Sequence, residues 1–76
     1  MKTQCPEKFK VLGENIAYYR KRLGYTQGTL AGRIGKNRDF IGKVEVQKTV
    51  RGVSLNTLFE LAEALDVWPG QLLDER

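Results

Sequence analysis

The side chains best suited to chemistry in this chain are cations, amides and one aromatic ring that lie close together around residue 40. Arg38 and Lys43 carry hydrogen-bond donors that suit O6 and N7 of guanine, and an arginine can engage both atoms at once. The Asp39 carboxylate can accept a bond from N4 of cytosine, and the Phe40 ring can contact a thymine methyl group. We therefore interpret Arg38, Asp39, Phe40 and Lys43 as candidate base-reading residues.

Asp39 and Phe40 each have a second interpretation. A carboxylate in the first turn of a helix stabilises the helix dipole by about 0.3–1 kcal/mol, and both roles stay open for Asp39. Phe40 is next to Ile41 in the sequence and would suit a core, but it falls off the apolar stripe that Ile41 and Val44 define. We expect its ring to contact DNA at a thymine methyl or a sugar edge.

Residues around this stretch suit the phosphate backbone. Lys36, Lys48 and Arg51 would neutralise phosphates, and each contact adds about one unit to the salt dependence without conveying sequence. Taken singly, each of these three side chains could equally be a solvated surface residue. Gln27 would begin a helix, where unpaired backbone N–H groups can receive a phosphate, and an exposed first-turn residue is the alternative.

Two short helices are predicted to position these residues. Apolar residues recur with helical spacing on either side of Gly35, at Leu30, Ala31 and Ile34 and then at Ile41 and Val44. Thr26 suits the N-cap of the first helix, and Asn37 suits the N-cap of the second. The pattern predicts a helix-turn-helix over about residues 27–46, a motif whose second helix fits a DNA major groove.

Three further helices complete the predicted fold. Pro6 suits the start of a helix to Leu23, with an apolar stripe at Phe9, Leu12, Ile16, Tyr19 and Leu23. Ser54 suits the N-cap of a helix with a stripe at Leu55, Leu58, Leu61, Ala62 and Leu65. Pro69 would open a short last helix, and residues 47–53 would form a loop. We expect an all-α, five-helix fold in a single domain over residues 1–76, with its core within 9–73.

Composition narrows the possible functions. There is no histidine and a single cysteine, Cys5, which excludes disulfide frameworks and Cys/His zinc sites. Without a nucleophile–base pair or a glycine-rich phosphate loop, we expect no enzyme, no metal and no cofactor. No apolar run approaches the roughly 20 residues that span a bilayer, so we expect a cytoplasmic protein with no membrane partner. Residues 1–53 carry a net charge of +8 and residues 54–76 a net charge of −4, which favours one basic side facing phosphates.

The ordered pattern over about residues 9–73 resembles the Cro/CI-type (XRE, lambda-repressor-like) helix-turn-helix family, which includes the controllers of restriction–modification systems. The matching residues are Leu12-Gly13, Ile16, Arg20, Gly24-Tyr25-Thr26-Gln27, Leu30-Ala31, Gly35, Ile41, Glu45, Leu55, Leu58, Ala62, Ala64-Leu65 and Val67. The resemblance implies a five-helix lambda-repressor-like DNA-binding domain that acts as a dimer on a pseudo-palindromic operator.

The resemblance also implies roles for single residues. Positions 38, 39 and 43 match base-reading sites, Gln27 matches a glutamine that contacts the DNA backbone, and Asn37 would cap its helix and reach a phosphate. Arg20 and Glu45 match an ion pair that fixes the angle of the third helix.

The chain departs from the family pattern at several places. Gly28, Gly32 and Gly42 stand where relatives more often have Glu, Arg or Ser, and each glycine costs about 1 kcal/mol relative to alanine in a helix. Val46-Gln47 replaces the usual Arg/Asn-Gly, which puts the placement of Lys48 and Arg51 in doubt.

Trp68 and Leu73 are the candidate subunit contact, because a small monomer has little left to cover them. The leading hypothesis is a homodimeric transcriptional regulator, a repressor or an autoregulatory controller, that binds double-stranded DNA without a small-molecule effector. The alternative is a protein-interaction module on the same fold, such as an antitoxin-like partner or a bridging factor.

Overall fold

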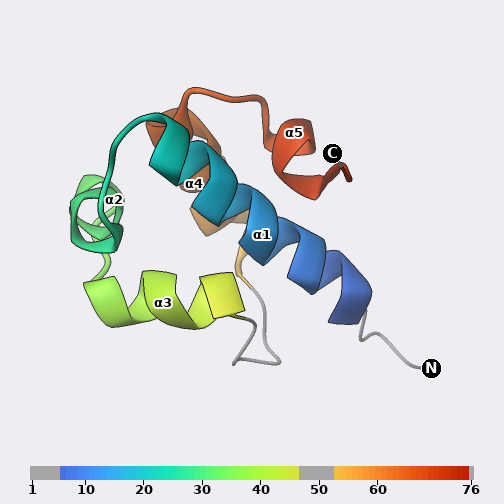
Figure 1. Ribbon diagram of the computed structural model, residues 1–76, viewed down its shortest axis with the longest axis horizontal. Coiled ribbons are helices and arrows are strands. Elements are labelled where there is room, and N and C mark those ends of the chain that lie inside the picture. Colours follow the sequence, from blue (N-terminus) through green and yellow to red (C-terminus); the bar gives the residue numbers. More distant parts are fainter. Residues whose placement is uncertain (1–5, 47–52, 76) are drawn as a thin grey trace.

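A computed structural model describes residues 6–46 and 53–75, which form five α-helices and no strand. The helices are α1 (Pro6–Arg22), α2 (Gln27–Arg33), α3 (Arg38–Val46), α4 (Leu55–Leu65) and α5 (Pro69–Leu73). In Figure 1, α1 runs diagonally across the molecule in front of α4, while α2 and α3 lie to one side and α5 to the other. The all-α, five-helix fold that the sequence predicts is confirmed for these residues. Two of the predicted phosphate contacts, Lys48 and Arg51, lie outside the described residues.

Local capping groups set where the helices begin and end. Side chains of Thr26, Asn37 and Ser54 each accept a hydrogen bond from the backbone N–H three residues later, at 3.0, 2.9 and 3.1 Å. Each bond satisfies one of the donors left unpaired at a helix start. Gly24 and Gly35 follow α1 and α2 with φ of 75° and 71°, a backbone region that glycine adopts without strain. The predicted N-caps are therefore confirmed.

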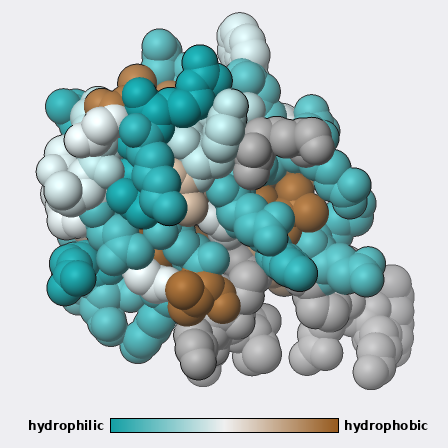
Figure 2. Space-filling view, viewed as in Figure 1, coloured by the Kyte–Doolittle hydropathy of each residue, from teal (hydrophilic) through white to brown (hydrophobic). Residues whose placement is uncertain are grey.

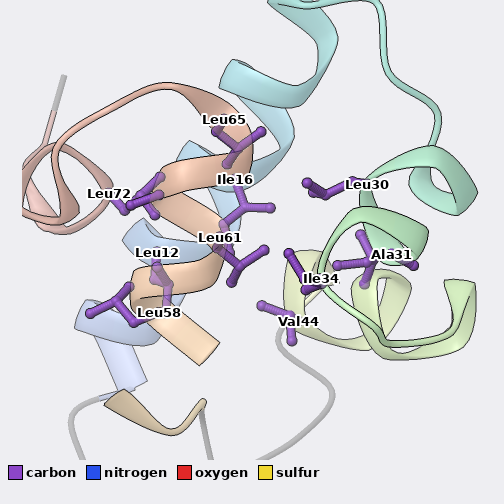
Figure 3. Packing of buried hydrophobic residues seen from close by; sticks show 12 residues of the cluster. Leu12, Ile16, Leu30, Ala31, Ile34, Val44, Leu58, Leu61, Leu65 and Leu72 are labelled. Carbon is purple, nitrogen blue, oxygen red and sulfur yellow. The ribbon is translucent and has the colours of Figure 1, made fainter. Parts of the chain in front are cut away.

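A single cluster of buried apolar side chains joins all five helices. Figure 3 shows side chains of α1 and α4 meeting those of α2 and α3, with Leu72 of α5 covering the other end. The cluster consists of Leu12, Ile16, Leu30, Ala31, Ile34, Ile41, Val44, Leu58, Leu61, Ala62, Leu65 and Leu72. The core thus holds α3 by its inner face and leaves the opposite face uncovered.

Two residues assigned to buried stripes are exposed. Leu23 is 43% exposed because α1 ends at Arg22 and the chain turns away at Gly24. Leu55 is 65% exposed because it is the first residue of α4, whose buried positions begin at Thr57. The prediction was wrong at both positions. None of the described helices combines the length and apolarity needed to cross a membrane.

Candidate nucleic-acid interface

The outer face of α3 carries the predicted base-reading side chains. Ile41 and Val44 are buried in the core, whereas Arg38, Asp39 and Lys43 are exposed. Figure 1 places α3 at the edge of the molecule, and Figure 2 shows that the surface over α2 and α3 is mostly hydrophilic. Three charged side chains are thus available to a partner that approaches α3 from outside.

Asp39 and Lys43 form an ion pair on this face. Lys43 Nζ lies 3.2 Å from Asp39 Oδ2, and both side chains are largely exposed. The two residues are four apart on one helix, a spacing at which opposite charges meet. Exposed pairs of this kind contribute about 0–1 kcal/mol, so either side chain can change partner at little cost. This pair is a third role for Asp39, and the four-residue spacing from Lys43 is its signal in the sequence.

Phe40 combines features of both interpretations. Its ring is partly buried and packs against the core cluster. Lys36 Nζ lies 5.4 Å from the ring centroid, a distance at which a cation is attracted to an aromatic face. Part of the ring therefore supports α3 from within while another part stays at the surface beside a cation.

Behind α3, Arg20 and Glu45 form a buried two-point ion pair. Arg20 Nε donates to Glu45 Oε2 at 2.7 Å, and Arg20 Nη2 donates to Glu45 Oε1 at 3.1 Å. Arg20 Nη1 donates to the carbonyl oxygen of Tyr25 at 2.9 Å. The structure thus contains the pair that the family resemblance implies, and this pair joins α1 to α3 and to the turn before α2.

Gln27 adds a third side chain to this network. Its Nε2 donates to Glu45 Oε1 at 3.0 Å, so the Glu45 carboxylate accepts bonds from both α1 and α2. Every buried side-chain nitrogen or oxygen among the described residues has a hydrogen-bond partner. A buried carboxylate is stable only when it is paired and hydrogen-bonded in this way. We call these three residues the Arg20–Glu45–Gln27 brace.

The three unusual glycines meet little in the protein itself. A Cβ at Gly32 would have no heavy atom within 4 Å. A Cβ at Gly28 would lie 3.8 Å from Thr26 Oγ1, and one at Gly42 would lie 3.7 Å from Gln27 Oε1. These are ordinary contact distances, so packing among the described residues does not require glycine at any of the three positions.

Exposed apolar side chains also occur on α4 and at the two ends of α5. Trp68 is 79% exposed and Leu73 is 48% exposed, in line with their selection as candidate subunit contacts. Leu55 and Phe59 are also exposed, and they lie one turn apart on α4. The sequence does not predict this second apolar pair, because helical spacing places Leu55 on the buried stripe.

The fold and this interface define a class, that of helix-turn-helix DNA-binding proteins. The Helix-turn-helix family model matches residues 16–70, and the chain belongs to that family. It is a DNA-binding transcription regulator of the XRE type, a class of regulators rather than enzymes.

Among curated proteins, the chain is similar to the control protein C.SmaI of Serratia marcescens. The two are 39% identical over 64 residues, which cover 84% of this chain and 74% of the relative.

Two solved structures extend the similarity. The restriction–modification controller protein C.AhdI of Aeromonas hydrophila has a TM-score of 0.79 and 33% identity, covering 87% of this chain and 97% of that one. SinR, the master regulator for biofilm formation, solved in complex with DNA, has a TM-score of 0.77 and 30% identity, covering 83% and 98% of the respective chains.

Proposed function

We propose that this protein is a homodimeric, sequence-specific regulator that reads the major groove of its operator with α3. One observation carries the proposal: α3 buries only its inner face, while Arg38, Asp39 and Lys43 project from the other side of a helix braced at Glu45. A helix held rigidly from behind is what direct base readout requires, because each bidentate contact depends on a fixed orientation.

The proposed base contacts follow the chemistry of each side chain. Arg38 and Lys43 would donate to guanine O6 and N7, and Asp39 would accept from cytosine N4 when Lys43 turns to the DNA. The exposed Asp39–Lys43 pair is weak enough for this exchange. Phe40 would present the surface part of its ring to a thymine methyl or a sugar.

Phosphate contacts would flank these bases. We assign them to Gln27, Lys36, Asn37, Lys48 and Arg51. Lys36 and Asn37 are exposed immediately before α3. Gln27 begins α2 and also holds Glu45, so a phosphate contact there would connect the DNA backbone to the brace.

The dimer would form through Trp68 and Leu73, whose exposure supports the assignment. Twofold symmetry would place the two copies of α3 about 34 Å apart, one turn of DNA. C.SmaI is a control protein and C.AhdI is a restriction–modification controller. Their similarity supports a controller or repressor role for this chain.

The test begins with selection of bound sites from a random DNA pool, followed by titration of the selected operator and of random DNA. We expect Arg38→Ala to weaken operator binding by about 1–3 kcal/mol, because one base contact is lost, with a smaller effect on random DNA. Lys10→Ala removes an exposed cation of α1 and serves as the control. Equal weakening of operator and random DNA by Arg38→Ala would contradict base reading, and failure to select any site would favour the protein-interaction alternative.

A further inference from the structure

Asn15 is a buried polar residue whose side chain connects the first helix to the last. It lies in the middle of α1 and is only 2% exposed. Its Nδ2 donates to the carbonyl oxygens of Leu72 at 2.9 Å and Asp74 at 2.7 Å, and it lies 3.3 Å from that of Gln71. A buried amide that donates to several carbonyl oxygens fixes the position of the segment that carries them. Moving that segment away would leave an unpaired amide in the core, which costs free energy.

Two of the three carbonyl groups, those of Gln71 and Leu72, belong to the last turn of α5, and the third belongs to its C-cap residue, Asp74. The last carbonyls of any helix have no partner within the helix, and α5 spans only Pro69–Leu73. A five-residue helix does not hold its own shape in water, since isolated helices shorter than about 12–15 residues are marginal. The orientation of α5 therefore depends on contacts with the rest of the protein.

These bonds set which side of α5 faces the core. Leu72 is fully buried, while its neighbour Leu73 is half exposed. At the other end of the helix, Gln71 Oε1 accepts a bond from the Trp68 backbone N–H at 2.8 Å. With its C-terminal end bonded to Asn15 and its first turn closed locally, α5 keeps Leu72 buried and leaves Trp68 and Leu73 at the surface.

We propose that Asn15 is the positioning residue of the subunit contact: its amide fastens the C-terminal end of α5 and so fixes the surface that a second copy of this chain binds. The inference rests on the proposed dimer. Asn15 itself lies inside the monomer and acts through α5.

The test compares Asn15→Asp with Asn56→Asp in the full chain. Asn56 is an exposed residue of α4, so the same chemical change there is a matched control. At neutral pH the new carboxylate has no proton to donate and faces three carbonyl oxygens. We expect faster hydrogen exchange in α5 with protection in α2 and α3 retained, and a dimer dissociation constant raised by at least about tenfold, as loss of a buried hydrogen bond implies.

Acidification provides a readout that a general packing defect would not share. A protonated carboxyl group can donate a hydrogen bond as the amide does, so lowering the pH should restore α5 protection in Asn15→Asp. Glu7, Glu14 and Glu75 line the cavity next to Asn15 together with Lys10, and the control variant carries the same four side chains. Asn15→Leu has no such donor and should show no recovery on acidification.

The outcomes separate this inference from the proposed dimer. A wild-type chain that sediments as a monomer would remove the dimer and this role with it. A wild-type dimer that Asn15→Asp leaves intact, or α5 exchange that does not change, would overturn this inference alone. If Asn15→Asp does not fold at neutral pH, the same comparison is made with Asn15→Leu, and uniform loss of protection across all helices would overturn the role.

Discussion

The helices α3 and α4 both pack on one core, but different interactions hold them in place. Residues 27–46 carry a net charge of +2, and polar side chains of the brace fix α3 from behind. Residues 55–73 carry a net charge of −3, and α4 is held by a full apolar stripe. The orientation of α3 therefore depends on directional bonds, whereas that of α4 depends on packed volume.

The largest expected effect comes from breaking the brace. Glu45→Gln leaves the buried Arg20 without its carboxylate, and loss of one partner of a buried ion pair costs about 3–5 kcal/mol. Urea unfolding should show this loss of stability. Replacing both Arg20 and Glu45 with methionine should recover much of it, because no unpaired charge then remains buried.

Glu63→Gln provides the control for this change, since Glu63 is an exposed residue of α4 and surface substitutions usually stay within about 0.5 kcal/mol. A similar loss for Glu45→Gln and Glu63→Gln would show that directional bonds do not distinguish the two regions.

The next effect tests packing in α4. Leu61 is fully buried, and Leu61→Ala should cost about 2–5 kcal/mol through lost burial and the cavity left behind. Leu55→Ala, at an exposed position of the same helix, should stay within about 0.5 kcal/mol when the monomer is unfolded by urea. Equal costs would mean that α4 buries a different face from the one described.

The smallest effect concerns the glycines of the helix-turn-helix. Gly32 lies in α2, and a Cβ there would meet nothing within 4 Å. Gly32→Ala should therefore raise the free energy of unfolding by about 0.5–1 kcal/mol, the difference in helix propensity between the two residues. Thermal unfolding measures the gain, and a loss of stability would reveal a contact at Gly32 that the helix geometry does not indicate.

Much of the fold could be predicted because its signals are local. The capping residues Thr26, Asn37 and Ser54 determine helix starts through bonds that span three residues. Gly24 and Gly35 act through their own positive φ after the helix ends. The exposure of Leu55 could not be predicted in this way, since it depends on where α4 first meets its neighbours.

The candidate site also combines features with local sequence signals and features that depend on long-range contacts. The exposed face of α3 followed from helical spacing, but Arg20 and Glu45 are 25 residues apart, and only the family resemblance indicated their pairing. Asn15 lies on the stripe between Leu12 and Tyr19, which was a usable signal for burial. Its acceptors lie 56 to 59 residues away, and no periodicity could have identified them.

The Arg20–Glu45–Gln27 brace holds α3 in place, whereas the base contacts are proposed for other side chains, on the outer face of α3. Because side chains of α1 and α2 hold Glu45 from the interior, the exposed Arg38 and Lys43 are not needed to hold α3 on the core. Under the proposed base readout, exchanging residues 38 and 43 for others would alter the preferred operator while the scaffold stayed intact. A lineage with this framework can acquire a new target sequence in one or two steps, without a compensating repair inside the protein.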